Sequence, residues 1–410
     1  MVLNYISKYT NFMPIFSLLK NKDFRIYIIA NSVNEFAFMS RLTAIGWLSY
    51  EISNSPTFVG LVAAVSGLSM SALSIFGGVL ADKFSKPKVM FVSKLGESIF
   101  ILTIALLLQF DNLNKSNLLI LMFLNGVMAA PYIPSRMGFI KELVGGKSLL
   151  SGNAVDFGFM TLVGSFTPAI AGIIIERFSI QLSLYLAFIA YCIHNILILS
   201  LRNKGTVYQN NYNLKIFESI RFILRLHIVQ YLLFTMLAVA VLVWNMETLS
   251  PVFAKDIFKL GASGFGILLS LGCLGAAIAS FSIASFNNIN INKLLTVSIL
   301  CAGGFIVIFS FVNNYILGMI LYGVIFAFGA SSENALSTLI QNSVPDSMRG
   351  RVISLQALTW GFSGFAGLLG GYLSEIYGIR IVILISGIVI LLISPIVKPI
   401  STNSKRMQIM

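Results

Sequence analysis

Between two long apolar runs the chain reads Gly77-Gly78-Val79-Leu80-Ala81-Asp82-Lys83-Phe84-Ser85-Lys86-Pro87-Lys88. The run before this cluster, 52–81, contains no charged residue. A helix needs roughly 20 apolar residues to cross the hydrocarbon core of a bilayer, and this run exceeds that length. A compact group of one acid and several bases between two such runs indicates a surface turn that joins two transmembrane helices.

The rest of the chain has the same character. It has 410 residues, of which 57% are hydrophobic and only 10% are charged, whereas a soluble domain averages about 25% charged residues. Further uncharged runs lie at 118–135, 178–201, 226–246 and 260–292. Because a bilayer offers no hydrogen-bond partners, the backbone of such runs must pair internally, as it does in a helix. The sequence therefore predicts an all-α integral membrane protein.

We predict twelve transmembrane helices in two pseudo-symmetric halves of six. The spans are expected at 24–50, 56–81, 88–110, 117–137, 148–175, 180–201, 227–250, 262–286, 293–312, 314–341, 350–375 and 380–398. The corresponding domains are an N-terminal tail (1–23), an N-terminal half (24–201), a linker (202–226), a C-terminal half (227–398) and a C-terminal tail (399–410).

Basic residues are distributed unevenly about these spans. If the N-terminus is cytoplasmic, the external loops contain only Lys115, Arg177, Lys255, Lys259 and Arg380, and most other bases lie inside. Such a bias sets the orientation of bacterial inner-membrane proteins, so we expect both termini in the cytoplasm. The net charge of +13 then faces anionic lipid headgroups, and we expect no nucleic-acid partner.

Several classes of site are disfavoured. Cys192, Cys273 and Cys301 all lie inside predicted spans, in a pattern that suits neither a disulfide framework nor a metal site. The N-terminal residues lack the apolar core and cleavage site of a signal peptide. No phosphate-binding P-loop is present. We therefore expect no metal, no cofactor and no ATP-driven step, and as partners a small-molecule substrate, protons and the lipid bilayer around a monomer.

The two predicted halves contain a faint internal repeat. Pro168-Ala169-Ile170-Ala171-Gly172, followed by Glu176, aligns with Gly367-Leu368-Leu369-Gly370-Gly371, followed by Glu375. Repeated halves are typical of secondary transporters, which bind substrate between the repeats near the middle of the membrane.

The loop cluster resembles the signature between helices 2 and 3 of the major facilitator superfamily. Gly78, Asp82, Lys83 and Lys86 fit that signature, whereas Ser85 replaces a glycine and Pro87 a base. Other segments are similar to the branch that holds macrolide efflux pumps and the enterobactin exporter. They are Asn21-Lys22-Asp23-Phe24-Arg25, Pro251-Val252-Phe253-Ala254-Lys255-Asp256 and Arg349-Gly350-Arg351-Val352.

The resemblance implies two devices. Asp82, oriented by Lys83 and Lys86, would cap the start of helix 11 near Arg349 and so lock one conformational state, with a basic topology-setting turn as the alternative. In helix 5, Gly164, Pro168 and Gly172 resemble the antiporter signature of proton-coupled exporters, in which small residues allow close packing and proline bends the helix. Ordinary small-residue packing is the alternative.

Glu35 is the leading candidate for a proton carrier. It lies about eleven residues into helix 1, or ~16 Å at 1.5 Å per residue, near the middle of the membrane. A charge there costs roughly 2.5–3.5 kcal/mol, so it needs a partner, a cavity or a function. Asn31, Asn34, Phe38 and Arg41 share its helical face. The alternative is a fixed pair between Glu35 and Arg41 or another cation.

The other embedded polar residues form two sets. Glu333 in helix 10 and Asp156 in helix 5 are further candidates for proton coupling, with an interhelical strut as the alternative for Glu333. The candidate substrate-binding residues are Asn31, Asn34, Arg41, Asn245, Glu247, Asn334 and Trp360. We interpret Lys94 and Glu97, three residues apart on one helix, as a structural ion pair.

These features favour a secondary active transporter that exports a small organic molecule, a siderophore or a drug-like amphiphile, by proton antiport with alternating access. The alternative is an importer or an uncoupled facilitator of a small anionic solute. A membrane-embedded enzyme is disfavoured because His194 and His227 are far apart and no acid cluster accompanies them. A non-transporting sensor with the same fold is a remote alternative.

Overall fold

The computed structural model describes residues 18–145, 148–203, 205, 226–285, 290–344 and 349–407, with some side chains within these ranges left undescribed. Its N-terminal half consists of α3 (Lys22–Ser53), α4 (Pro56–Lys83), α5 (Lys86–Gln109), α6 (Lys115–Ala129), α7 (Tyr132–Val144), α8 (Leu149–Arg177) and α9 (Ile180–Leu199). The C-terminal half consists of α11 (His227–Val243), α12 (Asn245–Thr248), α13 (Ser250–Val252), the π-helix η3 (Phe253–Ile257), α14 (Ala262–Ser285), α15 (Ile291–Ser310), α16 (Tyr315–Asn342), α17 (Arg349–Tyr377) and α18 (Ile379–Met407).

Local sequence explains where several helices start. Ser55 caps α4 by accepting a hydrogen bond from the Phe58 N–H, and Pro56 occupies the first turn, where no N–H is needed. Asn114 caps α6 and Asn314 caps α16 in the same way. These three helices therefore begin directly after a serine or asparagine that caps them.

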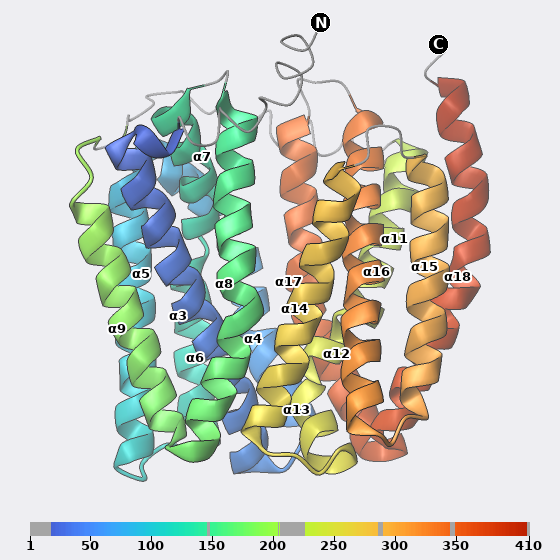
Figure 1. Cartoon of the computed structure of the whole chain (residues 1–410), viewed down its shortest axis with the longest axis horizontal. Coiled ribbons are helices and arrows are strands. Elements are labelled where there is room, and N and C mark those ends of the chain that lie inside the picture. The colour runs from blue at the N-terminus through green and yellow to red at the C-terminus, as the bar shows by residue number, and fades with distance from the viewer. Residues whose placement is uncertain are drawn as a thin grey trace, which may run out of the picture.

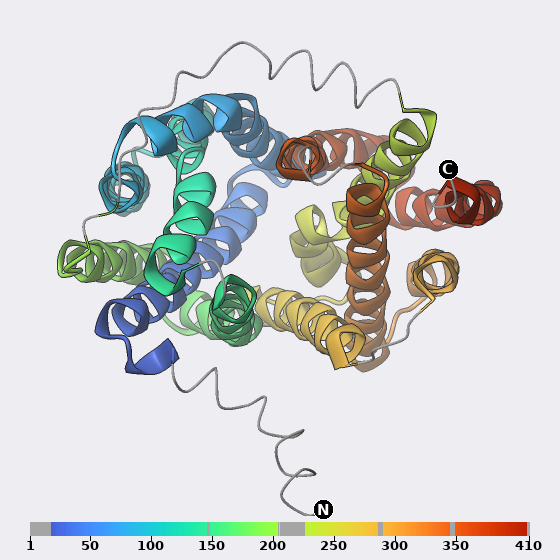
Figure 2. The ribbon, with the colours of Figure 1, turned by 90° about the horizontal axis from the view of Figure 1, so that it is seen from above.

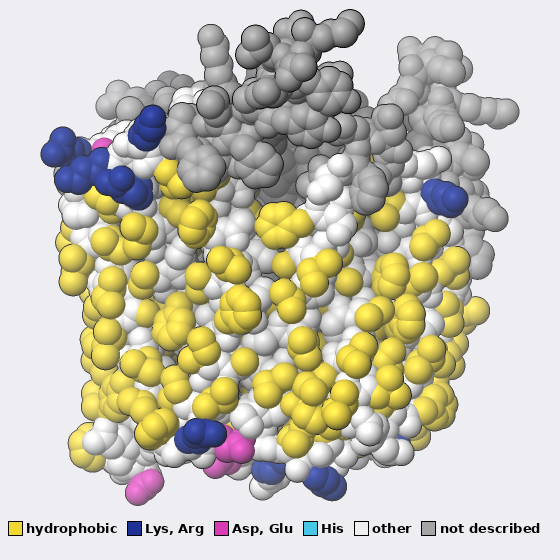
Figure 3. All heavy atoms as spheres, in the orientation of Figure 1, with side chains coloured by type: hydrophobic (Ala, Val, Ile, Leu, Met, Phe, Trp, Pro, Cys, Tyr) yellow, Lys and Arg dark blue, Asp and Glu magenta, His cyan; other side chains and the backbone are white. Residues whose placement is uncertain are grey.

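The helices have the lengths and composition of membrane spans. In the part of the chain that the structure describes, nine helical stretches are long and apolar enough to cross a bilayer. The remaining long helices are α3, which contains Glu35 and Arg41, α17 and α18. Apolar side chains cover the visible flank of the molecule, with charged side chains near its two ends (Figure 3). These features confirm the prediction of an all-helical membrane protein.

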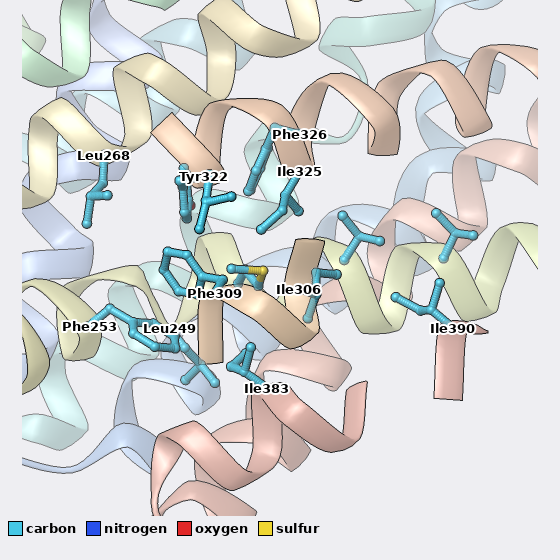
Figure 4. Packing of buried hydrophobic residues seen from close by; sticks show 14 of the residues in the cluster. Leu249, Phe253, Leu268, Ile306, Phe309, Tyr322, Ile325, Phe326, Ile383 and Ile390 are labelled. Atoms are coloured by element: carbon cyan, nitrogen blue, oxygen red, sulfur yellow. The ribbon is translucent and has the colours of Figure 1, made fainter. Parts of the chain in front are cut away.

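The chain folds as two groups of helices that lie side by side. Helices α3 to α9 form the blue-to-green group and α11 to α18 the yellow-to-red group (Figures 1 and 2). The most extensive contacts between the groups are the crossings of α4 with α17 and of α8 with α14. Within the C-terminal group, Phe253, Phe309 and Tyr322 pack at the centre of an apolar cluster (Figure 4).

Glycines permit the close approach at both crossings. A Cβ atom at Gly60 of α4 would meet the Gly367 carbonyl of α17, and one at Gly172 of α8 would meet the Ala262 carbonyl of α14. Without a hydrophobic drive between helices in lipid, such close packing is a main source of association.

Two predicted spans are interrupted. The span expected at 117–137 divides into α6 and α7 at Ala130 and Pro131, and the one at 227–250 continues past Trp244 as short pieces that lead into η3. Proline lacks the N–H that an unbroken helix needs, which accounts for a break at Pro131 and favours one near Pro251. A sequence window that averages hydropathy does not detect such breaks.

Candidate functional site

Glu35 lies midway along α3 and is 8% exposed. Its carboxylate faces α8 at Gly164, where an added Cβ atom would lie 3.3 Å from Glu35 Oε1. No hydrogen-bond donor and no cation lies within bonding distance of this carboxylate among the described residues. The absent side chain of Gly164 thus leaves room for an acid that has no fixed partner.

An ion pair lies near Glu35 on α5. Lys94 Nζ donates to Glu97 Oε1 at 2.7 Å, and both side chains are buried. The Lys94 ammonium also lies 3.9 Å from the centre of the Tyr132 ring, and the Tyr191 hydroxyl donates to Glu97 Oε2 at 3.4 Å. This geometry agrees with the interpretation of Lys94 and Glu97 as a pair.

A second ion pair joins α7 and α8. Arg136 Nε lies 3.7 Å from Asp156 Oδ2, and Asn31 of α3 donates to Asp156 Oδ1 at 2.7 Å. The Tyr132 hydroxyl in turn donates to Asn31 Oδ1 at 3.1 Å. Asp156 therefore has partners, and its role in proton coupling stays a prediction.

Tyr132 connects the two ion pairs, and sequence reasoning missed it. Its ring contacts Lys94 and its hydroxyl bonds Asn31, so one side chain ties α3, α5 and α7 together. The available signal was a tyrosine one residue after Pro131, inside a predicted span.

Arg41 is buried one and a half turns beyond Glu35 on α3. Its guanidinium lies 5.0 Å from the Phe38 ring centre, and no carboxylate lies within ion-pair distance of it in the described structure. Arg41 and Glu35 therefore do not form the ion pair that was the alternative role for Glu35, within the described structure. Asn34 is also buried, and its Oδ1 accepts no hydrogen bond from the described residues.

In the C-terminal half, the predicted residues Asn245 and Glu247 lie on α12, at the interruption of helix 7. Asn245 is 4% exposed and packs against Gly370 of α17, and within the described structure its Oδ1 accepts no hydrogen bond. Glu247 is half-buried. Irregular backbone at membrane depth is tolerated where it is buried in protein or lines a water-filled space. The structure does not bring these residues into bonding contact with Glu35.

The remaining predicted residues of this half lie on α16 and α17. Glu333 is half-buried, and Asn334 is exposed and donates to Ser280 of α14 at 3.1 Å. Beside them, Ser337 donates to Gln356 of α17 at 3.2 Å. The Trp360 side chain lies outside the described residues. The roles assigned to Glu333, Asn334 and Trp360 stay predictions.

At the signature loop, Lys86 forms a buried ion pair with Glu142 of α7, a contact not foreseen from the sequence. Lys83 is exposed, and an added Cβ atom at Gly78 would meet none of the described residues within 4 Å. The Asp82 side chain lies outside the described residues, so the proposed lock stays a prediction.

The proline of helix 5 lies inside α8. One residue on, the Ala169 N–H donates to Ser270 Oγ of α14 at 2.9 Å. Together with the contact of Gly172, this bond fixes α8 against the C-terminal half. The close contact of α8 with α14 therefore explains why position 172 is a glycine. Gly164 instead lies next to Glu35.

Comparison with known proteins gives a consistent result. Residues 13–405 match the family described as transmembrane secretion effector. The chain is similar to the staphyloferrin A transporter of Staphylococcus aureus, with 23% identity over 82% of this chain and 85% of that one. It is also similar to the enterobactin exporter of Escherichia coli, with 26% identity over 78% of each chain.

Solved structures support the fold. A nucleoside transporter superimposes with a TM-score of 0.74 at 15% identity, and the match covers 92% of this chain and all of that one. A peptide transporter of the POT family gives a TM-score of 0.77 at 12% identity, over 94% and 95% of the two chains. At such low identity these likenesses concern the fold alone.

Proposed function

Because the chain belongs to the transmembrane secretion effector family of major facilitator transporters, we propose that it exports a siderophore by proton antiport with alternating access. It is a secondary transporter and not an enzyme. Two relatives that bear siderophore names, one a transporter and one an exporter, support the substrate class and the direction.

The observation that carries the proposal is that the Glu35 carboxylate has no bonding partner among the described residues. Lys94 and Arg136, the bases of the two ion pairs, already have acidic partners in Glu97 and Asp156. In the part of the chain that the structure describes, Glu35 thus has no cation at bonding distance to keep it charged. A charge at this depth costs roughly 2.5–3.5 kcal/mol. Gaining a proton removes this cost, and losing it again requires water or substrate nearby.

Coupling then follows from differential binding. A proton can drive transport only if the two access states bind it with different affinity. Glu35 on α3 faces α8, and α8 packs on α14 of the other half. Relative movement of the halves would therefore change the surroundings of Glu35, which gives the proton a different affinity in each state.

Arg41 supports an anionic substrate. A guanidinium offers a planar fork of donors that matches a carboxylate, and Arg41 has no such partner within the described structure. A siderophore with free carboxylate or catecholate oxygens supplies an anionic partner for the guanidinium. A neutral drug-like amphiphile does not.

The test measures proton release from purified protein in detergent when enterobactin or staphyloferrin A is added. We expect wild type to bind one of these probes and release protons, and Glu35→Gln to bind it without release. Glu51→Gln removes an exposed acid from the same helix and is expected to behave as wild type. Binding with no proton release in wild type would overturn antiport and favour an uncoupled facilitator.

A further inference from the structure

Two glutamates bridge the halves near the ends of α8 and α17, and these helices end on the side of the molecule opposite the marked termini (Figure 1). Glu176, in the last turn of α8, accepts a hydrogen bond from the Ser263 N–H at 2.8 Å, in the first turn of α14. Glu375, in the last turns of α17, accepts hydrogen bonds from the Ser55 hydroxyl and from the Thr57 N–H, the latter at 3.4 Å, at the start of α4.

The two contacts are related by the internal repeat. Glu176 follows Gly172 by one turn, as Glu375 follows Gly371. An added Cβ atom at Gly172 would meet the carbonyl of Ala262, and one at Gly371 the carbonyl of Pro56. Ala262 and Pro56 are the first residues of α14 and α4. The same joint, a glycine contact followed by a glutamate on a helix N-terminus, therefore occurs twice.

Each joint gains its attraction only while the halves are in contact. The N-terminus of a helix carries partial positive charge and unpaired N–H groups, which favour a carboxylate. The glutamate belongs to one half and the helix start to the other, so separation of the halves at this end removes all three hydrogen bonds at once. Arg177 and Lys115 are the nearby bases, and neither lies within ion-pair distance of these carboxylates in the described structure.

Neighbouring contacts hold the same end. The Tyr50 hydroxyl of α3 donates to Asp256 Oδ2 at 2.5 Å, and Lys255 donates to Asn54 Oδ1 at 3.1 Å. Trp47 stacks on Phe265 of α14 with ring centres 6.1 Å apart. At the end opposite the termini, the two halves are therefore in contact at both joints and also through α3.

We propose that Glu176 and Glu375 are paired gating residues that hold this end closed and must leave the starts of α14 and α4 before it opens. The inference rests on alternating access from the proposed function, but not on the substrate or on proton coupling. In this proposal the two glutamates set how often this end is open or closed. Their hydrogen bonds go to the starts of α14 and α4 and not to the buried polar residues around Glu35.

The test measures the distance between spin labels at Asn112→Cys and Phe311→Cys, exposed loop positions of the two halves at this end, with Cys192, Cys273 and Cys301 replaced by serine. We expect Glu176→Gln and Glu375→Gln each to raise the ratio of long-distance to short-distance population by about two- to fivefold, the effect of one helix-terminal charge. The double variant should multiply the two effects.

Two further variants make the result decisive. Glu51→Gln removes an exposed acid at the same end that has no bond across the halves in the described part, and it should leave the distances unchanged. Gly261→Ala keeps every charge but places a Cβ atom 2.8 Å from the Glu176 Cδ, so it should reproduce Glu176→Gln. Unchanged distances in folded Gly261→Ala and in the double variant would overturn the proposal. Proton release by wild type tests the proposed function separately.

Discussion

The ammonium nitrogen of Lys94 lies 3.9 Å from the centre of the Tyr132 ring, although the two residues come from different helices. A desolvated cation on an aromatic face gains about 2 kcal/mol. This contact supplements the bond of Lys94 to Glu97 and helps to keep that pair formed beside Glu35.

Tyr132→Leu should therefore destabilise the protein more than Tyr132→Phe. The leucine variant loses the aromatic face and the hydroxyl, whereas the phenylalanine variant loses only the bond to Asn31, worth about 1 kcal/mol. Thermal unfolding in detergent measures the difference. Equal melting temperatures for the two variants would show that the ring does not stabilise Lys94.

Lys94→Met should lower stability strongly, because it leaves the Glu97 carboxylate buried without its cation. Breaking a buried pair by removing one partner costs about 3–5 kcal/mol. The double variant Lys94→Met/Glu97→Gln removes both charges and should recover most of the loss. A double-mutant cycle on melting temperature measures the coupling, and additive losses would contradict a tight pair.

Arg41→Gln should weaken binding of an anionic siderophore by roughly 10- to 100-fold, the value of a charge-assisted hydrogen bond. Arg41→Lys keeps the charge but not the planar fork, so it should fall between Arg41→Gln and wild type. Titration with enterobactin or staphyloferrin A measures the affinity. Unchanged affinity in folded Arg41→Gln would remove Arg41 from the substrate site.

Gly60→Ala should disturb the contact of α4 with α17, because its Cβ atom would fall on the Gly367 carbonyl. Gly304→Ala on α15 is the matched control, since its Cβ atom would meet nothing within 4 Å. In a helix that change is neutral or stabilising by about 0.5–1 kcal/mol. Melting temperature should fall for Gly60→Ala alone, and a fall of equal size in Gly304→Ala would indicate that the close approach has no special role.

The fold was predictable because each span is a long apolar run between polar turns. The breaks at Pro131 and after Trp244 were not, since they change the backbone without changing average hydropathy. Glu35 could be singled out as a candidate because a lone acid in an apolar run is costly, and its role stays a prediction. The Lys94–Glu97 ion pair could be predicted because three residues separate the two on one helix.

The partners that lie on other helices could not be predicted. Asn31 meets Asp156, and Lys86 meets Glu142, only because particular helices pack side by side. Nothing in their spacing along the chain encodes these contacts. The pair of Glu35 with Arg41, considered as the alternative to a proton carrier, shows the converse, since nearness on one helix did not produce an ion pair among the described residues.

The duplicated joint also has a practical use. The internal repeat places an equivalent glycine contact at each crossing. Gly60 packs on the Gly367 carbonyl, and Gly266 packs on the Pro168 carbonyl. Any substitution made in one copy therefore has a twin in the other, within a single polypeptide. If the two matched substitutions change the stability equally, the effect comes from the shared geometry of the joint. If they differ, it comes from the residues around each joint, so one protein provides two independent measurements.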